Sequence, residues 1–155
     1  MMNRPLLEQY PEIPYPYSRA IREDRRLALP KDLISTWDGS DELILTTFYR
    51  ENTLLLCSDD RFAKAQEALK ELNVMDSYVR RMRRNFVCEA VKVRLDSRRR
   101  IYIQKKFIAL LGYDTNVNSN GIFPVVIREY CDDMIEIMSS IAYEKWLSLY
   151  TGSKR

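Results

Sequence analysis

Hydrophobic and polar residues alternate along this chain in short runs, and the runs recur. Leu27-Ala28-Leu29 and Ile101-Tyr102-Ile103 alternate as residues of half-buried strands do. Both lie in longer segments, 26–34 and 100–108, whose apolar positions coincide at a constant offset of 74 residues. In each segment the predicted strand leads into a short helix, and the second helix is predicted to end at Gly112, a residue that readily adopts the left-handed conformation.

The repeat continues beyond these segments. Residues 43–45 and 125–127 are both β-rich runs, and residues 54–58 correspond to 135–139 at an offset of about 81 residues. Both of the latter runs enter a predicted helix at a serine, which is a favourable N-cap. Each unit is therefore predicted to contain, in order, a strand, a turn, a strand, a short helix, a strand, a turn, a strand and a helix. One such unit has little core, so we expect the two to pack together in an α+β fold that is mainly β.

The predicted long helices carry apolar stripes that indicate core or subunit interface. These stripes comprise Phe62, Ala65, Leu69 and Leu72, then Val79, Met82 and Phe86, and finally Tyr143, Trp146, Leu147 and Tyr150. The sequence thus divides into an extended proline-rich arm (1–16), a first unit with its helix (17–72), a basic connecting helix (73–86), a second unit with its helix (87–150) and a tail (151–155).

The distribution of charge along the chain indicates a candidate function. The chain has 155 residues and a net charge of only +3, but residues 80–106 hold eleven basic and two acidic residues, a local charge of +9. The remainder of the chain therefore carries −6. A basic block on an otherwise acidic protein indicates a polyanionic partner. The alternative is a solvated helix face beside an acidic protein neighbour.

Several kinds of chemistry are missing from the sequence. The chain has no histidine, no C-x-x-C motif and no phosphate-binding glycine loop. The acidic pairs are predicted to open a helix (Asp59-Asp60) and to form a turn (Asp132-Asp133). The three cysteines are widely spaced and are expected to be reduced thiols. We therefore expect no enzyme, no metal, no cofactor and no small-molecule substrate.

The chain also lacks the apolar segments of membrane and secreted proteins. No apolar run approaches the roughly 20 residues of a membrane span, and the first residues lack a signal-peptide core. A cytoplasmic protein without a membrane partner is expected.

The most informative segment is 91–103, in which two alternating strands flank a turn with consecutive arginines. Asp96 is a typical residue for the start of such a turn. A two-stranded ribbon fits the DNA major groove, where arginine can bind guanine O6 and N7 and where other arginines contact phosphates. The equivalent turn of the first unit is 22–26. The alternative is that both turns are only solvated surface.

The order of these motifs resembles the MraZ family of transcriptional regulators. Asp96-x-x-x-Arg100 followed by Ile-Tyr-Ile and a short helix is similar to the second MraZ repeat, and residues 78–91 are similar to the connecting helix and strand before it. Arg26-Leu-Ala-Leu-Pro30 matches the first repeat, while Ile135-Glu-Ile137 and the helix around Trp146 resemble the family's end. The resemblance covers about residues 17–150.

The resemblance implies two tandem swapped-hairpin AbrB-like units that form a β-barrel core with flanking helices. It also implies ring-shaped homo-oligomers that bind repeated promoter sites near cell-wall and division genes, hence a nucleoid-associated location on double-stranded DNA. By position, the implied DNA-facing residues are Arg22, Arg25, Arg26, Arg98, Arg99 and Arg100. Auxiliary basic residues, expected to give sequence-independent attraction or subunit contacts, are Arg80, Arg81, Arg83, Arg84 and Arg94.

Within this set, Arg100 is predicted to read a base; the alternative is that it braces the turn by pairing with Asp96. The chain departs from the family pattern at three positions. Arg25 and Arg99 stand where the family usually has glycine, and Arg22 stands where aspartate is expected. Two other classes of function remain open: an oligomeric interaction module of the same fold that has lost specific DNA binding, and an antitoxin-like AbrB relative.

Overall fold

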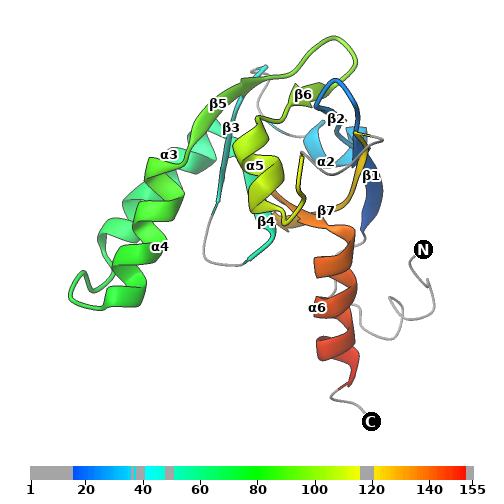
Figure 1. Ribbon diagram of the computed structural model, residues 1–155. Helices are drawn as coiled ribbons and strands as arrows, with labels where there is room; N and C mark the ends of the chain where they lie inside the picture. Colours follow the sequence, from blue (N-terminus) through cyan, green and yellow to red (C-terminus); the bar gives the residue numbers. More distant parts are fainter. Residues whose placement is uncertain (1–15, 36, 38–40, 48–50, 116–120, 153–155) are drawn as a thin grey trace.

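The computed structural model describes residues 16–35, 37, 41–47, 51–115 and 121–152 (Figure 1). Over these ranges the fold is α+β and mainly sheet, with eight strands and five helices. The predicted proline-rich arm lies outside the described residues except for Pro16, which is buried. Within the same ranges, no helix has both the length and the apolar character needed to cross a membrane.

The elements follow the predicted order in both halves of the chain. The first half comprises β1 (Tyr17–Ile21), β2 (Arg26–Ala28), α2 (Lys31–Ile34), β3 (Glu42–Thr47), β4 (Thr53–Ser58) and α3 (Asp59–Lys70). The second comprises β5 (Val91–Arg94), β6 (Arg100–Tyr102), α5 (Lys105–Leu110), β7 (Phe123–Cys131), β8 (Met134–Ser139) and α6 (Ser140–Gly152). Helix α4 (Ser77–Cys88) joins them.

The two halves interlock through their strands. One sheet has the order β1-β7-β8-β4-β3-β5, and a second contains β2 and β6. Strand β1 of the first half thus pairs with β7 of the second, and β5 of the second pairs with β3 of the first. The registers are equivalent, since Tyr17 lies opposite Ile127 as Val91 lies opposite Leu45. Each half therefore completes the sheet of the other. This agrees with the expectation that one unit alone could bury only a small core.

The larger sheet ends at β1 and β5 in the pairings of the described residues. The predicted closure of the strands into a barrel is not among these pairings. Strands β2 and β6 form a separate two-stranded ribbon, which brings the two arginine-rich segments together.

The alternating residues of the ribbon supply the main core. Leu27, Leu29, Ile101 and Ile103 are buried and pack with apolar residues of the large sheet and of α2 and α5. Complete burial of such a side chain contributes roughly 1.5–3 kcal/mol. The intervening residues of the ribbon, including Tyr102, are exposed. The ribbon therefore presents one apolar face to the core and one polar face to solvent.

The predicted helix stripes pack on the other face of the large sheet. Phe62 of α3 stacks on Phe86 of α4 at 4.9 Å between ring centroids, over Ile44 and Leu55. Tyr143 of α6 packs with Val126 and Met138 in a smaller cluster. Of the predicted stripe residues, Leu72 is not core: it lies beyond the end of α3 and is 41% exposed. The side chain of Tyr150 lies outside the described part of the chain.

Local signals fix several element ends. The hydroxyls of Ser58 and Ser139 each accept the backbone N–H three residues later, at 3.1 Å, as predicted for N-caps. Gly112 has φ +95° at the end of α5, and a Cβ there would lie 2.8 Å from the Asn52 side-chain oxygen. The connecting helix begins at Ser77 instead of residue 73, because the Asp76 carboxylate caps it by accepting the N–H of Tyr78 at 2.8 Å.

The three cysteines are free thiols. Cys57 is fully buried, and burial raises its pKa to about 12, so it is an unreactive core residue. Cys88 and Cys131 are exposed. Asp132 and Asp133 form the turn between β7 and β8, as predicted.

Candidate nucleic-acid interface

The turn between β1 and β2 is a tight hairpin closed by two backbone hydrogen bonds. The N–H of Arg25 donates to the carbonyl of Arg22 at 2.8 Å, and the N–H of Arg22 donates to the carbonyl of Arg26 at 3.0 Å. Arg25 has φ +62°. A β-turn followed by one left-handed residue is a common three-residue hairpin connection, and the left-handed position is usually glycine.

The turn between β5 and β6 repeats this geometry. The N–H of Arg99 donates to the carbonyl of Asp96 at 3.0 Å, and the N–H of Asp96 donates to the carbonyl of Arg100 at 3.0 Å. Arg99 has φ +58°. Arginine therefore occupies the left-handed position in both turns, where a non-glycine residue costs roughly 1–2 kcal/mol.

Each left-handed arginine is held by the other half of the chain. The carbonyl of Arg99 accepts the N–H of Leu29 at 2.9 Å, and the carbonyl of Arg25 accepts the N–H of Ile103 at 2.7 Å. These bonds extend the β2–β6 ladder at both ends, where Leu27 lies opposite Ile101. The ladder offsets the strain of the turns and sets them at opposite ends of one short ribbon.

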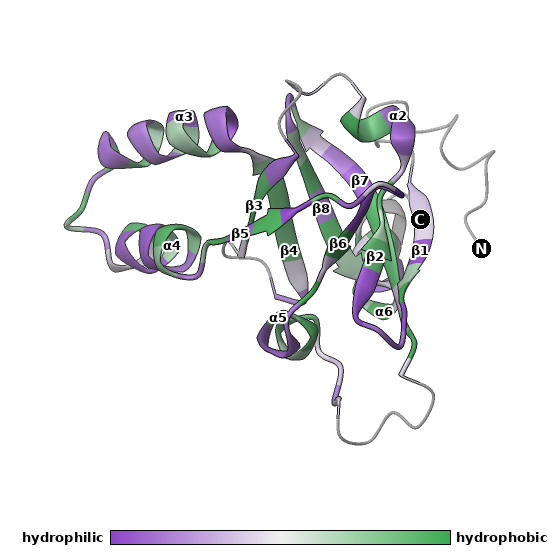
Figure 2. Cartoon of the chain, turned by 90° about the horizontal axis from the view of Figure 1, so that it is seen from above, coloured by the Kyte–Doolittle hydropathy of each residue, from purple (hydrophilic) through white to green (hydrophobic). Residues whose placement is uncertain are grey.

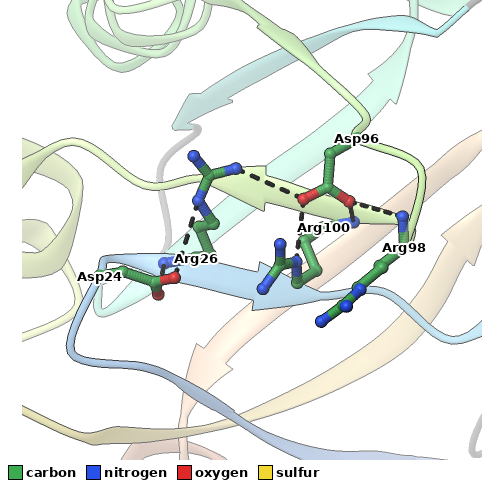
Figure 3. A network of polar contacts seen from close by, with 5 residues as sticks. All are labelled: Asp24, Arg26, Asp96, Arg98 and Arg100. Atoms are coloured by element: carbon green, nitrogen blue, oxygen red, sulfur yellow. Dashed lines mark hydrogen bonds and ion pairs between the residues drawn. The ribbon is translucent and has the colours of Figure 1, made fainter.

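Asp96 holds the base of the second turn (Figure 3). Its Oδ1 accepts the backbone N–H of Arg98 at 2.8 Å and that of Arg100 at 2.9 Å, and its Oδ2 accepts Nε of Arg100 at 2.9 Å. Arg26 of the first half also reaches Oδ2, at 3.4 Å. These contacts, led by the backbone N–H of Arg100, lower the pKa of Asp96 below its ordinary value. One carboxylate thus fixes the equivalent arginines of both repeats.

The first turn has a different acidic partner, because Arg22 stands where Asp96 stands in the second. Asp24, two residues later, accepts the backbone N–H of Arg26 on Oδ1 at 3.1 Å. The Oδ2 of Asp24 lies 3.7 Å from Nε of Arg26. The departure from the family pattern at Arg22 therefore leaves the turn itself intact. It adds an exposed cation to the first turn.

Five of the six predicted DNA-facing arginines fall into two groups. Arg26 and Arg100 are paired with carboxylates, and 42% and 32% of their side chains are exposed. Arg100 thus has the pairing of the bracing alternative. Side chains that are exposed and make no ion pair with another described residue are Arg22, Arg98 and Arg99.

Arg25 belongs to neither group. Its Nη1 donates to the Tyr102 hydroxyl at 3.0 Å, across the ribbon from the other half. Tyr102 did not emerge from the sequence, since only the strand register places it beside Arg25. Its equivalent in the first half is Ala28, so Arg99 has no matching hydroxyl.

Four of the five auxiliary basic residues lie apart from the turns. Arg80, Arg81, Arg83 and Arg84 are on α4, which extends with α3 from one side of the sheet while the ribbon lies on the other (Figures 1 and 2). Arg94 is on β5, 3.9 Å from Glu42. Of the auxiliary basic residues, Arg94 is therefore the one near a turn, two residues before Asp96.

The sequence matches no protein-family model, and no curated protein matches it. The likeness to MraZ proteins consequently rests on the order and spacing of the short sequence motifs alone.

Proposed function

We propose that this protein is a DNA-binding transcriptional regulator without catalytic activity or cofactor, of the kind that the MraZ resemblance implies. The observation that carries the proposal is the pair of matching arginine-rich turns at the two ends of the β2–β6 ribbon. Arg22, Arg98 and Arg99 present cations there that make no ion pair with another described residue. Two-stranded ribbons can enter the major groove, where arginine can bind guanine.

The roles of the six arginines differ in this proposal. Arg98 and Arg99 contact bases or phosphates from the second turn, and Arg22 and Arg25 do so from the first. Arg26 and Arg100 position the turns through Asp24 and Asp96, and either can exchange its carboxylate for a phosphate when DNA binds.

The strand exchange between the halves supports the finer description of the fold. We propose that the units are swapped-hairpin AbrB-like units, and that the ribbon and the large sheet together enclose a barrel-like core. The support is the equivalent pairing of β1 with β7 and of β5 with β3, and the common core beneath the ribbon.

Homo-oligomerisation beyond a dimer, such as a ring, is part of the proposal. The exposed residues Ile141 and Leu149 of α6 offer apolar surface of the kind that marks interfaces, with 73% and 74% exposure. Several linked turns would raise the effective concentration on repeated sites of nucleoid DNA. Light scattering at micromolar concentration should give a mass above that of a dimer; a stable monomer contradicts this part.

A titration with duplex DNA tests the function. The full chain is titrated with the duplex from upstream of its own gene, chosen for short direct repeats, and with a scrambled duplex, at several salt concentrations. Specific binding should be tighter by about a thousandfold or more, with affinity falling steeply as salt rises. Equal affinity for both duplexes contradicts sequence-specific regulation and favours the interaction module.

A further inference from the structure

Helices α3 and α4 form an arm with a groove between them, distinct from the arginine-rich turns. The groove has a volume of about 370 Å³. Its lining residues are Gln66, Leu69 and Lys70 of α3 and Arg80, Arg83, Arg84 and Val87 of α4. The α4 residues have the spacing i, i+3, i+4, i+7, so they form one continuous stripe along the helix.

The groove is strongly basic. Four of its seven lining residues are cations and none is acidic. Lys70 pairs with Glu67 at 3.0 Å on the exposed surface of α3. Arg83 and Arg84 make no ion pair with any described residue. Such a concentration of cations is complementary to an anionic ligand.

The groove also has an apolar component. Its apolar lining residues are Leu69, which is 8% exposed, and Val87, which is 36% exposed. The connection between the helices, outside the lining of the groove, also exposes Met75 (80%) and Val74 (45%). A phosphate backbone would leave these apolar atoms uncovered, whereas a peptide with apolar side chains would bury them.

The arm is built to keep this surface in place. The Phe62–Phe86 stack holds the two helices together. The guanidinium of Arg80 donates to the carbonyls of Val74 and Met75, each at 2.9 Å, which secures the connection at the tip. The groove is therefore preorganised, which lowers the ordering cost of binding.

The geometry points to a docking site for an acidic, amphipathic helix of another protein, laid along the groove between α3 and α4. Apolar side chains of that helix contact Leu69 and Val87, while its carboxylates pair with Arg83 and Arg84. This is the helix-in-groove mode of recognition. It does not involve the arginine-rich turns, because the arm and the ribbon lie on opposite sides of the molecule (Figures 1 and 2).

A synthetic peptide provides the probe. We choose a labelled helix of roughly 15 residues, about four turns, with leucine at i, i+3, i+4 and i+7 spacing and glutamate beside it. Its binding to the full chain is followed by fluorescence anisotropy, with a scrambled peptide of the same composition as reference. Saturable binding that is weaker for the scrambled peptide is expected.

Matched charge reversals then locate the site. Arg83→Glu should weaken peptide binding about tenfold or more, because it places an anion against the glutamates. Arg81→Glu changes the net charge equally on the same helix but outside the groove, and it should weaken binding much less. Val87→Ser should weaken binding a few-fold with little change in its salt dependence, since it removes an apolar contact. Circular dichroism checks that each variant is folded.

Amide chemical-shift mapping on the wild-type chain is the measurement that needs no variant. Shifts confined to α3 and α4 are expected. The inference is overturned if the peptide does not bind saturably at low salt, or if Arg81→Glu and Arg83→Glu weaken it equally. It is also overturned if Arg83→Glu instead abolishes duplex DNA binding, or if it dissociates an oligomer. The last two results would make the groove a nucleic-acid surface or an interface between copies of this chain.

Discussion

Arg100 and Asp96 close the second arginine-rich turn from opposite ends: Nε of Arg100 donates to Oδ2 of Asp96 at 2.9 Å, and the backbone N–H of Arg100 donates to Oδ1 at 2.9 Å. The same carboxylate receives Arg26 from the other repeat at 3.4 Å. The arginine that the motif singles out is thus a positioning residue in the free protein.

The Asp96 carboxylate should make stability depend on acid pH. Its pKa is lower in the folded chain than its ordinary value of 3.8. The stabilisation is therefore fully present above that value and is lost as the pH falls through the lowered, folded-state pKa. We expect Asp96→Asn to lower the melting temperature at neutral pH, and the difference from wild type to shrink as the solution is acidified below pH 3.8.

Asp60→Asn, at an exposed ion pair with Lys64 on α3, is the control, since such pairs contribute little. A difference between wild type and Asp96→Asn that stays constant down to the lowest pH contradicts the prediction.

Arg100→Ala, measured beside Asp96→Asn, should lower both the melting temperature and specific DNA affinity.

Replacing Arg99, the left-handed arginine of the second turn, should raise the stability of the protein but lower its affinity for DNA. Arg99→Gly removes a side chain from a residue with φ +58°, so we expect unfolding to become less favourable by about 0.5–1 kcal/mol. The same change should weaken DNA binding because it removes an exposed cation. Arg98→Gly removes an equal charge at a residue without positive φ, and there glycine should lower stability. Denaturant titration measures both, and a destabilised Arg99→Gly would contradict the strain argument.

Tyr102 should influence DNA binding through Arg25. Tyr102→Phe removes only the hydroxyl that accepts Arg25 Nη1 at 3.0 Å, on the exposed face of the ribbon. Stability should change by less than about 1 kcal/mol. DNA affinity should fall a few-fold in the wild-type background and hardly at all in Arg25→Ala. A double-mutant cycle on DNA affinity measures this coupling, and strictly additive effects would rule it out.

A buried ion pair distinguishes the second half from the first. Nη2 of Arg128 lies 2.8 Å from Oε1 of Glu136, their side chains are 7% and 3% exposed, and the guanidinium lies 4.1 Å from the Trp146 ring centroid. Arg128→Ala should destabilise the protein by about 3–5 kcal/mol, because it leaves a buried carboxylate without its partner.

Replacing both Arg128 and Glu136 should lower the stability much less than replacing Arg128 alone. Leu55 lies opposite Glu136 and occupies the equivalent place in the first repeat. We therefore expect the double variant Arg128→Met/Glu136→Leu to recover most of the stability lost in Arg128→Ala. Thermal or denaturant unfolding gives the comparison. A double variant as unstable as the single one would show that the pair is needed for more than mutual neutralisation.

Local chemistry made much of the fold predictable from the sequence. The alternation around Leu27 and Ile101, the serine caps at Ser58 and Ser139 and the stop at Gly112 each depend on residues a few positions apart. The repeat was visible because equivalent strands and helices need the same apolar spacing. The boundary of α4 was shifted by a few residues, since the cap at Asp76 is one of several polar residues there that could begin a helix.

By itself, the sequence determined that two similar units place consecutive arginines at two hairpin turns. Only the tertiary structure decided which unit each strand completes, and hence that Arg26 meets Asp96 and that Arg25 meets Tyr102, 70 and 77 residues away. Long, flexible arginine side chains can reach many partners, so their contacts follow from the register between strands. That register depends on how the two halves of the chain pack together to complete one core. A short stretch of sequence does not contain this information.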